Sequence, residues 1–138
     1  NALIHRSVEN IRFAWGVTTV NETYRTLLAQ EVTADYSLGY STVFGYRAST
    51  AIPFLYYDLA NEMSTALMVY PVVTNEHAFL AQTPIEIIKQ LKHLEENLPL
   101  DSCVHCFAIS NKVLENSAEN EALRSVFISY LQAHDRKK

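Results

Sequence analysis

Apolar residues recur at three- and four-residue steps between residues 84 and 97, and this spacing predicts an amphipathic helix. Thr83 precedes it, and its hydroxyl can accept a hydrogen bond from the N–H of Glu86, whose carboxylate can reach back to Thr83. Pro84 stands at the first helical position, where no backbone donor is needed. The stripe expected to be buried consists of Ile85, Ile88, Leu91, Leu94 and Leu98.

Two further helices are expected near the ends of the chain. Leu3–Trp15 is the first, because its apolar residues follow a 4-3-4 spacing and Gly16 can end the helix. Asn116–His134 is the second, because its apolar residues repeat at helical steps from Leu123 onward.

From Thr18 to Ser49 the residue types change to Thr, Val, Tyr and Phe, which favour strands. Tyr24–Tyr36 and Tyr40–Arg47 are predicted to be strands, with a turn at Ser37–Gly39 between them. Cys103–Ser110 is a short apolar run that suits a buried strand.

The segment from Ala51 to Thr74 fits two different structures. As a hairpin, it has strands at Ile52–Leu59 and Ala66–Val73 around a polar bend. As a helix, it gathers Asp58, Asn61, Glu62 and Thr65 on one face. Aromatic and β-branched residues are frequent in both halves, and we therefore favour the hairpin.

The order of these elements predicts an α+β domain. Its sheet is expected to be mostly antiparallel with about four to five strands, and to carry the N-terminal helix and two helices of the C-terminal half. The 138 residues suffice for one domain, 1–138, with a single core, and no linker or repeat divides them.

The formal net charge of −4 disfavours nucleic acid as a partner, because phosphate binding needs clustered Lys and Arg. No apolar run approaches the roughly 20 residues that span a bilayer, and no signal peptide is evident. These absences favour a cytoplasmic location. The chain starts at Asn1 without a methionine, so an extracytoplasmic domain of a longer protein is the alternative.

Cys103 and Cys106 flank His105, and this spacing suggests either a redox pair or half of a zinc site. A closed zinc site needs four ligands, and no second pair of cysteines exists. In a regular strand, the two cysteines would point to opposite faces, beyond disulfide reach. We therefore expect two buried structural thiols and no metal or other cofactor.

Other polar residues offer acid–base chemistry without a recognised motif. Glu76 and His77 read as a solvated loop, and Asp58 and Glu62 flank a turn if the hairpin forms. The three glycines of the chain are too few and too widely spaced for either common nucleotide-binding loop. The alternative that stays open is a small hydrolase-like enzyme that assembles His77, His105, Asp58 and Glu62 in space.

Tyrosines are concentrated in the strand-rich middle of the chain, where they suit pocket linings and interfaces. With no catalytic motif present, we favour a non-enzymatic binding module, either a sensor or regulatory domain or a dedicated partner-binding protein. Its partner would be a protein or a small apolar ligand, and the terminal helices allow a homodimer. The candidate binding residues are Tyr40, Tyr46, Tyr56, Tyr57, Tyr70 and His77.

Overall fold

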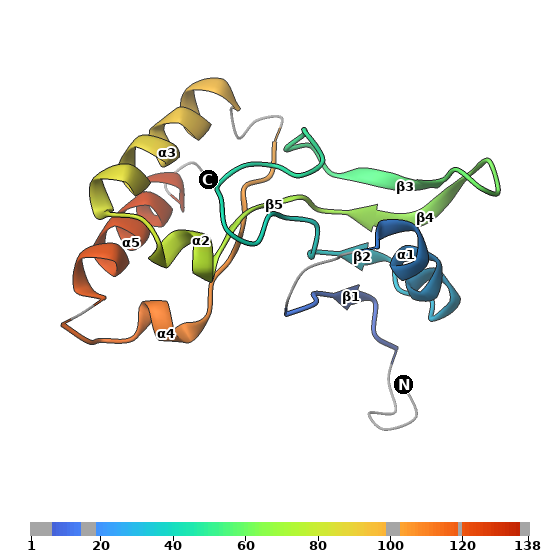
Figure 1. The fold of residues 1–138 in the computed structure, drawn as a ribbon, viewed down its shortest axis with the longest axis horizontal. Coiled ribbons are helices and arrows are strands. Elements are labelled where there is room, and N and C mark those ends of the chain that lie inside the picture. The colour runs from blue at the N-terminus through green and yellow to red at the C-terminus, as the bar shows by residue number, and fades with distance from the viewer. Residues whose placement is uncertain (1–6, 15–18, 99–102, 119, 136–138) are drawn as a thin grey trace.

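The computed structural model describes residues 7–14, 19–98, 103–118 and 120–135 (Figure 1). Helices and strands are mixed along the chain, so the α+β class is supported at that level. In chain order, the elements are β1 (Asn10–Ile11), α1 (Val20–Ala29), β2 (Ala34–Asp35), β3 (Phe54–Asp58), β4 (Met63–Val69), β5 (Val72–Asn75), α2 (Glu76–Leu80), α3 (Pro84–Asn97), β6 (Cys106–Ala108), α4 (Asn111–Leu114) and α5 (Glu121–Asp135).

The strands form a mixed sheet and a separate parallel pair, so the prediction of one mostly antiparallel sheet is wrong. The larger sheet has the order β1-β2-β4-β3, in which β1, β2 and β4 are parallel and β3 is antiparallel to β4. The smaller sheet pairs β5 with β6 in parallel. The chain runs along β3 and turns back into β4, which then lies beside β2. Because β4 and β2 run in the same direction, they form a parallel pair.

The hairpin favoured between Ala51 and Thr74 is confirmed. Phe54 pairs with Val69 at one end of β3, and Asp58 pairs with Met63 at the other. Glu62 closes the bend with a φ of 50°, in the left-handed region. Pro71 lies between β4 and β5, and its missing N–H interrupts the strand ladder there.

The predictions for residues 24–47 are wrong. Tyr24–Tyr36 is mostly helix α1 and the turn after it, and only Ala34–Asp35 within it is a strand, β2. The helix forms because Val20, Tyr24 and Leu27 recur at helical spacing and pack into the core. Tyr40–Arg47 forms no strand. It belongs to the irregular segment 36–53, which is joined to the β5 backbone by hydrogen bonds from Val72 N–H to Leu38 O and from Gly45 N–H to Val73 O, both of 2.8 Å.

The N-terminal helix expected at Leu3–Trp15 falls partly outside the described residues. Within 7–14, the chain forms no helix, and the prediction is wrong there. Ile11 instead pairs with Asp35 of β2. A pattern of only two heptads could not outweigh pairing with a neighbouring strand.

The helix predicted from the capping sequence is confirmed as α3. Glu86 N–H donates to the Thr83 hydroxyl at 3.3 Å, and Thr83 N–H donates to the Glu86 carboxylate at 2.7 Å. The expected stripe is shifted, because Ile87 is fully buried whereas Ile85 is 66% exposed. The helix turns the face containing Ile87, Leu91 and Leu94 toward the core.

The C-terminal half contains the second long helix that was expected, observed as α5. The strand expected at Cys103–Ser110 is shorter than expected, because only Cys106–Ala108 forms a strand, β6. Residues 101–102 lie outside the described part. A short helix, α4, was not anticipated.

Buried apolar side chains form two clusters where one core was expected. The first lies between α1 and the hairpin and contains Tyr24, Leu27, Val32, Leu38, Tyr56, Leu67 and Val69. The second lies among α2, α3, α4, α5 and the smaller sheet and contains Val73, Phe79, Ile87, Leu91, Leu94, Val113 and Phe127. Figure 1 shows the two groups of elements at opposite ends of the molecule, connected by the chain running from β4 into β5.

Candidate functional site

A cleft forms where the carboxyl ends of parallel strands meet. Residues 12–14 follow β1, residues 36–41 follow β2, and Asn75 and Ala108 end β5 and β6. Two adjoining hollows make up this strand-end cleft, with about 330 and about 400 Å³ of empty space, part of which is open solvent. Ligands of open α/β sheets commonly bind beyond the carboxyl ends of the strands. The cleft is therefore the candidate site.

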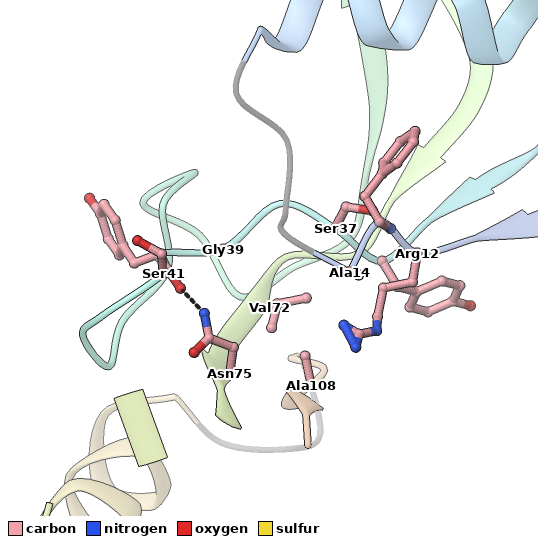
Figure 2. Close-up of a pocket in the computed structure, with 11 residues that line it drawn as sticks. Arg12, Ala14, Ser37, Gly39, Ser41, Val72, Asn75 and Ala108 are labelled. Atoms are coloured by element: carbon pink, nitrogen blue, oxygen red, sulfur yellow. Dashed lines mark hydrogen bonds between the residues drawn. The ribbon is translucent and has the colours of Figure 1, made fainter. Parts of the chain in front are cut away.

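Arg12 contributes the cation of the cleft. It lines both hollows, and in the first it is the only charged residue of the described lining. Figure 2 shows its guanidinium on one side of the hollow, with Ser41 and Asn75 on the other side and Val72 between them. No ion pair or hydrogen bond joins this guanidinium to another described residue. It is available to donate two parallel hydrogen bonds to a carboxylate or phosphate.

Asn75 holds the opposite wall in place. Its Oδ1 accepts from the N–H of Ala78 at 3.1 Å and caps α2. Its Nδ2 donates to the carbonyl oxygen of Tyr40 at 2.8 Å, the contact drawn in Figure 2. Both ends of the amide are engaged, so Asn75 positions the wall, and Ser41 is the serine that lines both hollows. Ser41 is exposed and makes no hydrogen bond within the described part of the chain.

A buried network supports the floor of the cleft. Asp35 is fully buried, and Tyr24 donates to its Oδ2 at 3.0 Å. The hydroxyl of Ser37 donates to the Oδ1 of Asp35 at 2.5 Å and accepts from the N–H of Phe13 at 2.8 Å. Burial, followed by the charge of Asp35, raises the pKa of Tyr24, so its hydroxyl remains a donor. The network fixes the segment after β1, which carries Arg12, against the end of β2.

Aromatic rings give the cleft its apolar surface. Tyr36 stacks on Tyr70 with ring centroids 4.5 Å apart and 11° between planes. Tyr36, Phe13 and Tyr40 line the first hollow, and Tyr40 is 44% exposed. Flat, partly accessible rings suit an apolar or planar part of a ligand.

The second hollow adds Glu76 and His77, the first two residues of α2. Glu76 is half-buried, and neither an ion pair nor a hydrogen bond links it to the rest of the described chain. This hollow therefore carries a carboxylate, an imidazole and a guanidinium at its walls.

The six candidate binding residues are spread over several places. Tyr40 and His77 line the strand-end cleft. Tyr70 stacks behind it on Tyr36, and Tyr57 is exposed on β3. Tyr56 is 4% exposed within the first core cluster and donates to Asn21, which leaves it little surface for a ligand.

Tyr46, the remaining candidate, lies beside His105 with ring centroids 6.5 Å apart. The Nε2 of His105 faces the carbonyl of Leu98 at 3.0 Å, and its Nδ1 faces the hydroxyl of Tyr130 at 3.0 Å. A carbonyl only accepts, so Nε2 carries the proton and Nδ1 accepts from Tyr130. Burial lowers the pKa of His105, in keeping with a neutral ring that connects α3 to α5.

Cys103 and Cys106 are thiols of intermediate exposure, so they are less buried than expected. Burial raises the pKa of Cys106, which disfavours its nucleophilic thiolate form. Across the described ranges, no group of three or more His, Cys, Asp or Glu side chains is arranged to hold a metal ion.

Asp58 and Glu62 lie at the hairpin bend, as the hairpin reading predicts. Asp58 pairs with Arg25 through two hydrogen bonds of 2.9 and 2.6 Å. The Arg25 hydrogen bonds hold the pKa of Asp58 well below its ordinary range, with further help from Asn61. Asp58 therefore joins the bend to α1, and of the four residues of the enzyme hypothesis only His77 lines the strand-end cleft.

Sequence reasoning missed Arg12, Tyr36 and Ser41 as cleft residues. All three follow strands of two residues, which are too short for an alternating pattern to reveal. The one available signal is that Arg12 and Ser41 lie among apolar and aromatic neighbours.

No family model, curated protein or solved structure matches this chain. None of the helices in the described ranges is long and apolar enough to cross a bilayer.

Proposed function

We propose that the chain is a non-enzymatic binding module whose strand-end cleft takes a small molecule with an anionic group. The observation that carries the proposal is the guanidinium of Arg12, which faces the cleft without a carboxylate partner in the described chain. In a protein with a net charge of −4, an unpaired cation at a concave, partly aromatic surface favours an anion.

The chemistry of the first hollow favours binding over catalysis. The first hollow contains no carboxylate or imidazole in its described lining, so it offers no general base. The ligand differs from the purely apolar one expected from the sequence, because a guanidinium left unpaired against an apolar group would lose its hydration without compensation.

A titration with two matched probes tests this proposal. The carboxylate 3-phenylpropanoate and its neutral amide are added to ¹⁵N-labelled protein, and amide shifts of Gly39, Ser41 and Asn75 are followed. We expect the carboxylate to bind more tightly, and Arg12→Gln to weaken it about tenfold, the loss of one charge-assisted hydrogen-bonded pair. Lys89→Gln, which removes an equal charge from the exposed side of α3, is the control. Equal affinity for both probes, or no effect of Arg12→Gln, contradicts the proposal.

A small hydrolase is the second candidate, because Ser41, Glu76 and His77 line the same hollow. A nucleophilic serine needs a base within hydrogen-bond reach, and the Ser41 hydroxyl makes no hydrogen bond to described residues. Labelling with a fluorophosphonate separates the two candidates. Covalent labelling that Ser41→Ala abolishes would establish the hydrolase, and absence of labelling in the folded protein would exclude a serine nucleophile of this type.

A further inference from the structure

Arg12 and Glu76 line one hollow with opposite charges, and no ion pair joins them. Glu76 is half-buried, whereas Arg12 is exposed at the rim of the hollow. Arg12 and Glu76 are also without hydrogen-bond partners elsewhere in the described chain. Two opposite charges that line one hollow without pairing are both available to bind the opposite charges of a ligand.

We infer that the ligand is a free α-amino acid, whose carboxylate pairs with Arg12 and whose ammonium pairs with Glu76. This inference rests on the proposed function and extends it. A ligand with a single negative charge would satisfy Arg12 and bring a second anion close to Glu76, which costs free energy because like charges repel. A zwitterion satisfies both side chains and adds no net charge to the hollow.

The surroundings favour an amino acid with an aromatic or large apolar side chain. The hollow that contains Glu76 shares Arg12, Ser41 and Asn75 with its neighbour, so the two hollows adjoin. The rings of Tyr36 and Tyr40 line the neighbouring part. A ligand held by its charged end between Arg12 and Glu76 can direct its side chain toward these rings, where stacking adds affinity.

Three probes that share a phenyl ring and differ in charge test the inference. They are L-phenylalanine, 3-phenylpropanoate and phenethylamine, which carry both charges, the carboxylate alone and the ammonium alone. Dissociation constants are measured by NMR titration for the wild type, Arg12→Gln and Glu76→Gln. Glu96→Gln, an exposed glutamate on α3, is the matched control for Glu76, and circular dichroism confirms that each variant is folded.

We expect the wild type to bind L-phenylalanine about tenfold or more tightly than either singly charged probe, as a second charge-assisted contact provides. Arg12→Gln should weaken L-phenylalanine and 3-phenylpropanoate, whereas Glu76→Gln should weaken L-phenylalanine and phenethylamine. Glu96→Gln should leave all three unchanged.

The outcomes separate this inference from the proposal beneath it. If Glu76→Gln leaves the affinity for L-phenylalanine unchanged while 3-phenylpropanoate still depends on Arg12, the amino-acid inference fails and the anion site stands. Glu76 would then serve the dipole of α2 alone, and its removal would lower stability without changing affinity. If none of the three probes shifts the cleft resonances, both the inference and the proposed function are overturned.

Discussion

The hydroxyl of Ser37 lies 2.5 Å from Oδ1 of Asp35, at a point where both residues are buried. This contact joins the end of β2 to the segment after β1, because the Ser37 oxygen also accepts from the N–H of Phe13. Arg12 directly precedes Phe13. The cleft cation is thus placed by a buried polar network, which resists distortion because each lost hydrogen bond strands a partner away from water.

Ser37→Ala is expected to destabilise the protein by about 1–3 kcal/mol, the cost of leaving buried polar groups unpaired. The substitution removes a donor to Asp35 and an acceptor for the N–H of Phe13. Urea unfolding followed by circular dichroism measures the change. Ser125→Ala, at an exposed position of α5, should stay within about 0.5 kcal/mol of the wild type. A Ser37→Ala variant as stable as this control would show that the network contributes nothing.

Gly39→Ala is expected to destabilise the fold and displace the cleft wall. A Cβ at residue 39 would lie 3.0 Å from both the Cβ and the carbonyl oxygen of Val72, closer than side-chain carbons normally approach. Overpacking of this kind typically costs about 1–3 kcal/mol. The measurement combines urea unfolding with the amide shifts of Ser41 and Asn75, which follow the wall. An unchanged unfolding midpoint together with unchanged shifts would contradict the close approach of this segment to β5.

Arg25→Gln is expected to reduce the dependence of stability on acid pH. The folded pKa of Asp58 is lowered chiefly by its hydrogen bonds from Arg25, so the stabilisation is complete above the ordinary aspartate pKa of about 4 and is lost as pH falls below it. Unfolding free energies at pH 6 and pH 2.5 should therefore differ less in Arg25→Gln than in the wild type. Arg124→Gln, which removes an arginine from α5, is the control. Equal slopes in Arg25→Gln and the wild type would refute the linkage.

His105 gives a second pH dependence, in a higher range. Burial lowers its folded pKa, so the unfolded chain binds the proton more readily, and stability decreases as pH falls below the ordinary histidine value of about 6.5. His105→Gln should lose the part of this decrease between pH 7.5 and 5.5 that His105 causes. Unfolding experiments at the two values measure it. A variant whose stability falls as steeply as that of the wild type would assign the dependence to other groups.

The parts of the fold that could be predicted are those specified by neighbours in the chain. Thr83, Pro84 and Glu86 satisfy the start of α3 among themselves, and no distant contact was needed to locate it. The hairpin was recoverable for a similar reason, because its two strands are adjacent in sequence and the polar bend separates them.

The parts that failed depend on distant contacts. Tyr24 has a residue type common in strands, yet it is buried in a helix, packs edge-to-face on Tyr56 and donates to Asp35. Helical spacing from Val20 to Leu27 was present but was outweighed by residue type. The strand-end cleft was out of reach because Arg12, Ser41 and Glu76 come from three separate segments that only the sheet topology brings together.

The most direct test of the central claim is a crystal structure of the protein soaked with 3-phenylpropanoate. The account requires the carboxylate to lie within hydrogen-bond distance of the Arg12 guanidinium, with the phenyl ring near Tyr36 or Tyr40. An occupied site elsewhere, with Arg12 directed into solvent and the cleft filled only by water, would contradict it.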